Sequence, residues 1–360
     1  MKLTERRPRE ALTRLLSLLL LGALLLGGCA PGASPEDRSV AVPDGPLAAL
    51  PLGADLAPAH LADARPEDFE AAPAPVHEPF VFDPGETPLA AKAALVYDAT
   101  AERELFAKNG DLRIPPASTA KILTALLVLE LGDPDERFTV GSELDMTLPG
   151  SSRCWLRKGS SYTVNELLHG LMLCSGNDAA YVLAVHLGRK LSGQPKLGSK
   201  AACAYFCELM NGRAAELGAL SSHFVSPEGW DYADTYTTVR DMCLITRAAM
   251  ENPAFRELAA CTDFRFTTPA GTFHHWRTNN GLLSPSSEYY LPEAIGGKTG
   301  TTDNARCCLV TAAAVNRHEI YVLVYGCPRN EERYTDTLRL CETYRRASLR
   351  SVFLLEPSED

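Results

Sequence analysis

Apolar and polar positions divide the chain into a front part without a sustained period and a long second part with regular patterns. Residues 30–88 show neither helical nor strand spacing. From residue 93 onward, short strand-like runs occur near both ends of the second part, and longer runs with helical spacing lie between them. This distribution predicts one sheet built from both ends of a domain, with a helical insertion.

The predicted strands are Ala93–Asp98, Glu104–Lys108, Phe264–Thr268, Thr272–Arg277, Ala294–Thr299, Cys308–Val315 and Ile320–Tyr325. The predicted helices run from Ser118 to near Gly132, from Thr163 to Leu173, from Asp178 to Leu187, from Ala201 to Leu217, from Thr238 to Met250 and from Glu331 to about Arg350. Short connections late in the chain favour antiparallel pairing. We therefore expect an α/β fold of the α+β type over residues 89–355, with an antiparallel sheet flanked by helices and a helical lobe inserted.

Three helix starts carry capping signals. Thr163 and Glu166 form a T-x-x-E capping box. Thr238 precedes another helix in the same manner, and Asn177 is a candidate N-cap for the helix that follows it.

The N-terminus has the pattern of a secretory signal. Basic residues precede an apolar run, Leu15 to Leu26, that is short for a membrane span. The run ends in Leu26-Gly27-Gly28-Cys29, which resembles the lipobox of bacterial lipoproteins. That resemblance implies a signal peptide over residues 1–28 and a lipid on Cys29. We expect an exported protein that is lipid-anchored at the extracytoplasmic face of the bacterial cytoplasmic membrane; the alternative is an uncleaved signal anchor.

Charge and proline are concentrated in the segment after the signal. Of the 25 prolines, 12 lie in residues 30–88, where eleven Asp or Glu face two Arg, a balance of −9 in a chain of formal net charge −10. Such a composition predicts a tether over residues 29–88 rather than a folded domain. The rest of the chain carries no basic patch, so we expect no nucleic-acid partner.

Cysteine and histidine spacing gives no metal signature. Eleven cysteines are present, or ten beside Cys29, and none shows a C-x-x-C spacing. An even number in an exported chain permits disulfides, but Cys203 and Cys207 lie on one predicted helix and Cys307 and Cys308 are adjacent. Buried free thiols are the simpler expectation, and we expect no metal and no cofactor.

The first candidate for chemistry is Ser118-Thr119-Ala120-Lys121, at the start of an apolar helix. Residues i and i+3 share a helix face, and side chains lean toward the N-terminus, so Lys121 reaches back over Ser118. Burial or a nearby cation favours a neutral lysine, which can accept the serine proton. Alone, S-x-x-K also fits a capping serine beside a surface lysine.

Two further motifs follow in order. Ser175-Gly176-Asn177 places a hydroxyl and an amide at a break between two helices. Lys298-Thr299-Gly300 closes a strand-like run and offers a cation, a hydroxyl and a strand edge without a side chain. The three motifs in this order are far less expected by chance than any one of them.

At this point the chain resembles the penicillin-recognising serine enzymes, and more closely the serine D-alanyl-D-alanine carboxypeptidases, the low-molecular-mass penicillin-binding proteins. The stretches YTVNELLHGLMLCSGNDAAYVLA, HFVSPEGW and GGKTGTTDNA carry the likeness. It implies Ser118 as acyl-ester nucleophile, Lys121 as general base, Ser175 as proton relay and Asn177 as a substrate-positioning group. Lys298 and Thr299 would face the substrate carboxylate beside Gly300, and the N–H groups of Ser118 and Thr301 would form the oxyanion hole.

The implied substrate is a peptidoglycan stem peptide ending in D-Ala-D-Ala, with β-lactams as covalent inhibitors. Alternatives are a DD-endopeptidase, a penicillin-sensing module without catalysis, and a class A β-lactamase, for which no deacylating carboxylate is evident. A Ser-His-Asp site at His274-His275 is disfavoured, because neighbouring strand residues point to opposite faces. Asn279 and Arg277 receive no substrate role.

Overall fold

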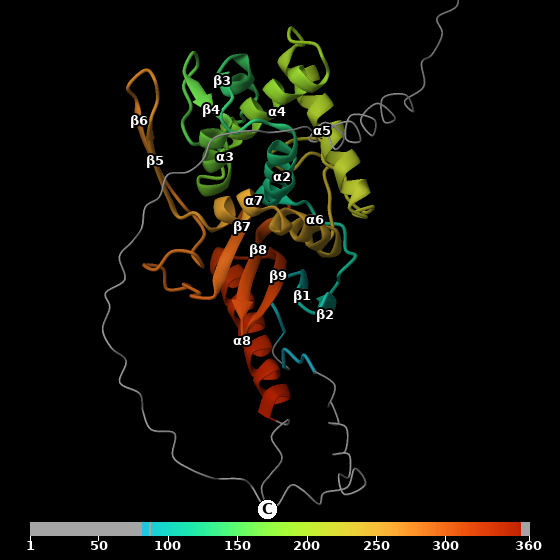
Figure 1. Cartoon of the computed structure of the whole chain (residues 1–360). Helices are drawn as coiled ribbons and strands as arrows, with labels where there is room; N and C mark the ends of the chain where they lie inside the picture. Colours follow the sequence, from blue (N-terminus) through green and yellow to red (C-terminus); the bar gives the residue numbers. More distant parts are fainter. Residues whose placement is uncertain (1–80, 86–87, 354–360) are drawn as a thin grey trace, which may run out of the picture. The chain divides into compact units, whose positions relative to one another are not determined.

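The computed structural model describes residues 81–85 and 88–353, which are built around a five-stranded sheet (Figure 1). The strand order is β2-β1-β9-β8-β7, and every neighbouring pair is antiparallel. The strands are β1 (Ala93–Asp98), β2 (Arg103–Lys108), β7 (Ala294–Thr302), β8 (Arg306–Val315) and β9 (His318–Cys327). The predicted signal peptide, Cys29 and nearly all of the tether lie outside the described residues.

Helices and two small hairpins complete the described part. The helical elements are η2 (Ala117–Ala120), α2 (Lys121–Leu131), η3 (Ser142–Met146), α3 (Val164–Leu173), α4 (Asn177–Leu191), α5 (Ser199–Glu216), α6 (Val239–Glu251), α7 (Pro253–Ala260) and α8 (Asn330–Phe353). One hairpin pairs β3 (Arg137–Thr139) with β4 (Ser161–Thr163), and the other pairs β5 (Asp263–Thr267) with β6 (Phe273–Arg277).

The sheet joins the two ends of the domain, as the sequence pattern predicted. Ala93 on β1 lies opposite Tyr325 on β9. Helix α8 covers one face of the sheet, against β8 and β9, while α6, α7 and η2 contact the other face (Figure 1). Helices α2 to α5 form the inserted lobe, with α2 at its centre, so the expected fold class is confirmed.

Alternating side chains of β9 feed two separate apolar cores. Tyr321, Leu323 and Tyr325 belong to the core shared with the helical lobe, whereas Val322 and Val324 belong to the core under α8. All five are at most 4% exposed. Because successive strand residues point to opposite faces, one continuous apolar run serves both layers, and the strand is fixed in register from two sides.

Two of the three predicted caps are confirmed. Thr163 and Glu166 form the complete capping box, and the Thr238 side chain accepts a hydrogen bond from Asp241 N. The Asn177 cap is wrong: Gly176 occupies the N-cap position of α4, and Asn177 is the first helical residue. Its side chain is used elsewhere, as described below.

Three further features differ from the sequence-based expectation. Helix α7 was not predicted, although Asn252 caps it through hydrogen bonds from two backbone N–H groups and Pro253 stands at its first position. The short β3–β4 hairpin was also missed. Strand β7 continues to Thr302, so Lys298-Thr299-Gly300 lies within the strand rather than at its end.

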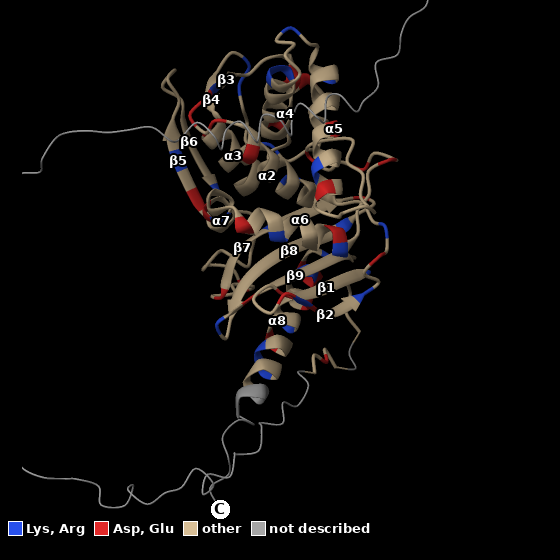
Figure 2. Ribbon diagram, turned by 45° about the vertical axis from the view of Figure 1, so that its right-hand side comes forward, with Lys and Arg blue, Asp and Glu red and all other residues tan. Residues whose placement is uncertain are grey.

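In Figure 2, ribbon positions of Lys or Arg and of Asp or Glu are interspersed over the described part of the chain. No helix in residues 81–85 and 88–353 is long and apolar enough to cross a membrane.

Candidate active site

Ser118 lies on the 3-10 turn η2, immediately before α2 begins at Lys121. The turn is held from two sides. A Cβ placed on Gly229 would lie 1.9 Å from the backbone oxygen of Ala117, and one placed on Gly300 would lie 2.9 Å from Ser118 N. Ser118 itself remains partly exposed, whereas Lys121 is fully buried. The hydroxyl is therefore accessible and the amine behind it is not.

The amine of Lys121 is surrounded by three oxygen atoms. Its Nζ lies 2.8 Å from Ser118 Oγ, 2.8 Å from Asn177 Oδ1 and 2.9 Å from the backbone oxygen of Glu228. The contacts come from η2, α4 and the loop of residues 226–229, so three separate elements fix one side chain. The predicted contact between Ser118 and Lys121 is confirmed.

Burial lowers the pKa of Lys121 to about 7. Glu228, Asp178 and Cys154 act in the opposite direction and raise it. A pKa near neutrality leaves a large neutral fraction of the amine, which can take a proton from a hydroxyl 2.8 Å away. This neutral fraction comes mainly from the lack of water around the amine, which lowers its affinity for a proton.

Ser175 lies at the break between α3 and α4, in a left-handed backbone conformation with φ of 56°. It is 3% exposed. The same break is secured by Gly176 N, which donates to Gly170 O, and by Asn177 N, which donates to Ser152 O. A non-glycine residue in this conformation is uncommon, and such strain occurs frequently at functional sites.

Asp178 anchors the segment beside this break. Its carboxylate accepts hydrogen bonds from the backbone N–H groups of Cys154, Leu156 and Ala179. The Cys154 thiol donates to the same carboxylate. The sequence indicated only a helix-start role for Asp178, whereas the structure uses it to hold residues 152–156 against the start of α4.

The third motif lies on β7 and consists of Lys298, Thr299 and Gly300. Lys298 is 1% exposed, and its Nζ donates to Thr299 O at 3.0 Å. Burial lowers its pKa well below the usual value, and repulsion from Lys121 and from Arg333 lowers it further. The two lysines therefore lie near enough to oppose each other's charge. For Lys121, burial is the cause that lowers the pKa, and it is one of the two reasons for a neutral lysine that the sequence suggested.

The rest of β7 is held by Arg333, which the sequence did not single out, and by Asn279, to which the sequence gave no substrate role. Arg333 on α8 donates to Gly300 O at 3.1 Å and to Thr301 Oγ1 at 2.9 Å. Thr299 Oγ1 donates to Asn279 Oδ1 at 2.9 Å. Their long sequence separation from the motif left no local signal by which they could have been found.

The motifs lead us to expect Ser118, Lys121, Ser175 and Lys298 within hydrogen-bonding reach of one another or one water apart. Of these four, Ser118 and Lys121 are in direct contact, and Lys121 also contacts Asn177. Among the described residues, neither the Ser175 hydroxyl nor the Lys298 amine hydrogen-bonds to Ser118 or Lys121. The oxyanion-hole pair of Ser118 and Thr301 stays a prediction, supported by the close approach of β7 to Ser118 N.

The histidine pair lies outside this site. His275 bonds to Asp263 at 2.5 Å on the β5–β6 hairpin, and His274 packs against Tyr162. Neither contacts Ser118, as the strand pattern indicated. Arg277 is an exposed strand residue near Asp263.

No group of three or more His, Cys, Asp or Glu side chains in the described part of the chain is arranged to hold a metal ion. All ten cysteines of this part are free, and eight of them are buried.

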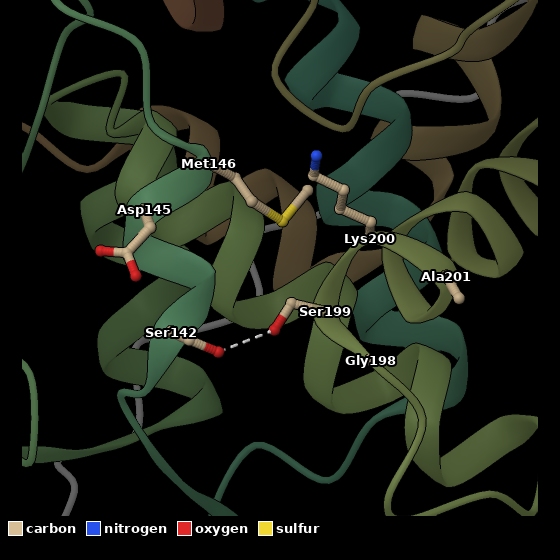
Figure 3. A pocket seen from close by; sticks show the side chains of 7 residues that line it. All are labelled: Ser142, Asp145, Met146, Gly198, Ser199, Lys200 and Ala201. Carbon is tan, nitrogen blue, oxygen red and sulfur yellow. Dashed lines mark hydrogen bonds between the residues drawn. The ribbon is translucent and has the colours of Figure 1, made fainter.

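A pocket of about 480 Å³ lies apart from the three motifs, between η3 and the start of α5 (Figure 3). It is lined by Ser142, Asp145, Met146, Gly198, Ser199, Lys200 and Ala201. In Figure 3 the Ser142 and Ser199 hydroxyls face each other, at 3.1 Å. None of the motif residues lines the pocket, so the chemistry is assigned to the Ser118 cleft.

Comparison with known proteins agrees with this geometry. Residues 81–328 match the model of peptidase family S11, D-alanyl-D-alanine carboxypeptidase. The chain belongs to the D-alanyl-D-alanine carboxypeptidase family. The serine-type carboxypeptidase expected from the sequence is confirmed at this level.

Relatives of this carboxypeptidase come from distant bacteria. The D-alanyl-D-alanine carboxypeptidase DacB2 of Mycobacterium tuberculosis is 35% identical over 241 residues, 66% of this chain and 75% of that protein. DacA of Escherichia coli is 30% identical over 254 residues, covering 68% and 58%. A crystal structure of a Streptomyces DD-transpeptidase, 30% identical, superposes with a TM-score of 0.66 over 72% of this chain and 98% of that one.

Proposed function

We propose that this carboxypeptidase removes the terminal D-Ala from peptidoglycan stem peptides through an acyl-enzyme on Ser118. The observation that carries the proposal is the buried Lys121 amine 2.8 Å from a partly exposed Ser118 hydroxyl. The same attack on a β-lactam carbonyl accounts for inhibition by penicillins, because the ring-opened acyl group would stay on Ser118.

The acylation step moves one proton twice. Ser118 Oγ attacks the carbonyl carbon of the penultimate D-Ala while its proton passes to Lys121. The C–N bond to the terminal D-Ala then breaks, and the leaving amine takes that proton, for which we assign the relay to Ser175. Water subsequently cleaves the ester, which releases the shortened peptide and restores the Ser118 hydroxyl.

Lys298 and Thr299 are assigned to the terminal carboxylate of the substrate. A carboxylate beside the buried Lys298 amine favours its ammonium form. The resulting cation opposes a second charge on Lys121, since Lys121 already lowers the pKa of Lys298 by repulsion. Substrate binding would in this way favour the neutral Lys121 base at the moment it is required.

Fluorescent penicillin tests the nucleophile. The full chain is expected to be labelled covalently, and Ser118→Ala is expected to lose the label while melting like the wild type. A diacetyl-Lys-D-Ala-D-Ala peptide then tests the reaction, with D-Ala release measured enzymatically. Labelling of Ser118→Ala at the wild-type rate would refute the assignment, and labelling without D-Ala release would leave a penicillin-sensing module.

We further propose export and a lipid anchor on Cys29, because the lipobox-like sequence follows a short apolar run. Residues 29–88 would then serve as the tether between the membrane and the peptidase domain. Metabolic labelling with an alkyne fatty acid should mark the wild type and not Cys29→Ala. Equal labelling of both would contradict the anchor without affecting the peptidase assignment.

A further inference from the structure

Glu228 is a buried acidic residue directly behind the proposed base. Its backbone oxygen accepts the hydrogen bond from Lys121 Nζ at 2.9 Å. The preceding carbonyl, Pro227 O, accepts from Thr124 Oγ1 on α2 at 2.6 Å. Loop 226–229 is therefore attached to α2 at two points one helical turn apart, and this brings an acidic side chain to the interior of the lobe.

The carboxylate of Glu228 is only partly satisfied. The residue is 2% exposed, and Oε1 accepts a hydrogen bond from Tyr181 OH at 2.7 Å. Oε2 is buried and has no hydrogen-bond partner in the described part of the chain. Glu228 also forms no ion pair with any described residue. A buried carboxylate with one unpaired oxygen and no ion pair lowers the stability of the fold unless another charge compensates it.

The charge of Glu228 acts on Lys121 without contacting it. The titratable groups that face Lys121 are Glu228 from loop 226–229, Asp178 from α4, Cys154 from residues 152–156 and Lys298 from β7. Of the groups that raise the pKa of Lys121, Glu228 is the strongest. Asp178 is engaged by three backbone N–H groups and a thiol, so its charge is largely satisfied locally.

The groups around Glu228 itself do not neutralise it. Tyr181 and Tyr232 lie close to it, and burial first, then the charge of Glu228 among other causes, raises the pKa of both phenols. The pKa of Cys207 on α5 is also raised, mainly by its hydrogen bond with Cys203 and by burial, with Glu228 among the further causes. All three groups are uncharged at neutral pH, so none of them supplies a positive charge to the carboxylate.

We propose that Glu228 is a positioning residue whose carboxylate sets the pH at which Lys121 begins to act as the base. The proposal rests on the function proposed above. Complete burial next to a second lysine would by itself make the Lys121 amine a weak base, because its neutral form would persist far below neutral pH. A buried negative charge behind the amine restores its affinity for a proton, and the same residue holds the amine in place through its backbone oxygen.

The test is the pH dependence of acylation by fluorescent penicillin from pH 5 to 9. Glu228→Gln keeps the shape and can still accept from Tyr181 OH, but it removes the charge. In a plot of the second-order rate constant against pH, the acid limb is the part in which the rate constant rises as Lys121 loses its proton. We expect this acid limb to move to lower pH by roughly one unit, as the loss of a nearby opposite charge predicts. The variant should therefore label faster than the wild type near pH 5.5.

Two further variants separate charge from structure. Glu228→Asp keeps the charge, so its acid limb should stay close to the wild-type position even if the plateau rate falls. Glu143→Gln removes an equally buried carboxylate, 1% exposed, on η3, and should leave the acid limb unchanged.

An unchanged acid limb in Glu228→Gln would overturn the proposal, whatever happens to the plateau, because a purely structural role moves only the plateau. An equal shift in Glu228→Asp would overturn it as well. If the wild type is not labelled at Ser118 at all, the proposed function fails first, and that result is distinct from a labelled wild type with an unresponsive acid limb.

Discussion

Gly300 is where the third motif comes closest to the nucleophile, and replacing it with alanine tests the shape of the cleft. A Cβ at this position would lie 2.9 Å from Ser118 N, 3.0 Å from the Ala117 Cβ and 3.1 Å from Thr119 N. None of these atoms can rotate away, since two are backbone nitrogens and the third is a Cβ. The turn cannot retreat either, because Gly229 blocks it from behind.

The methyl group must therefore push β7 away from η2. Ordinary van der Waals contact requires about 3.4 Å or more, so the two elements must separate by roughly 0.5 Å. A 1 Å displacement at a catalytic site costs on the order of 100-fold in rate, so roughly half that displacement should cost on the order of 10-fold, which is about 1.4 kcal/mol of activation free energy. Overpacking also lowers the unfolding free energy by about 1–3 kcal/mol.

The assay is the second-order rate constant of labelling by fluorescent penicillin at pH 8, with thermal melting to confirm folding. Gly300→Ala should label on the order of 10 times more slowly than the wild type. Gly212→Ala is the matched control, because a Cβ there meets nothing within 4 Å. Labelling of folded Gly300→Ala within threefold of the wild-type rate would refute the close approach of β7 to Ser118.

Three other measurements follow from the structure. Acylation should rise with pH through a midpoint near 7, because protonated Lys121 cannot accept the Ser118 proton as pH falls below its pKa of about 7; a rate independent of pH between 6 and 8 would contradict this. Asp178→Ala should lower the unfolding free energy, measured in urea, by about 3 kcal/mol, because three backbone N–H groups lose a charged acceptor. A loss below about 1 kcal/mol would contradict that anchoring. In denaturant, Cys29→Ala should react with Ellman's reagent at ten thiols, whereas the native protein should react only at the half-buried Cys174 and Cys261. Fewer than ten reactive thiols in denaturant would reveal a disulfide.

Local sequence patterns were sufficient for most elements of the fold. Short strand-like runs located every strand of the five-stranded sheet, and the longest of them, β8 and β9, are nearly continuous buried runs. Capping residues located α3 and α6, since Thr163 and Thr238 satisfy backbone N–H groups within a few residues of themselves. Helix α7 was missed because its eight residues are too few to display a period, although Asn252-Pro253 marked its start.

The sequence predicted the residue types of the site but not the residues that hold them in place. The spacing of Ser118 and Lys121 implied their contact, because helical geometry is local. Burial of the lysine, and the role of Glu228 behind it, depend on the packing of loop 226–229, which is more than a hundred residues away in the sequence. Asn177 shows the limit most clearly: its sequence position predicts a cap, whereas its side chain contacts Lys121.

The pairing of β1 with β9 also determines when the enzyme can become reactive. A chain synthesised as far as Leu283 already contains Ser118, Lys121 and Asn177, yet lacks β7, β8 and β9. In such a chain β1 has only β2 beside it, and nothing yet covers η2 on the side that Gly300 later occupies. Pairing strands so far apart in sequence is a slow step in folding. The site around Ser118 is thus completed only when the C-terminal strands pair, so removal of β7 to β9 should abolish labelling by fluorescent penicillin.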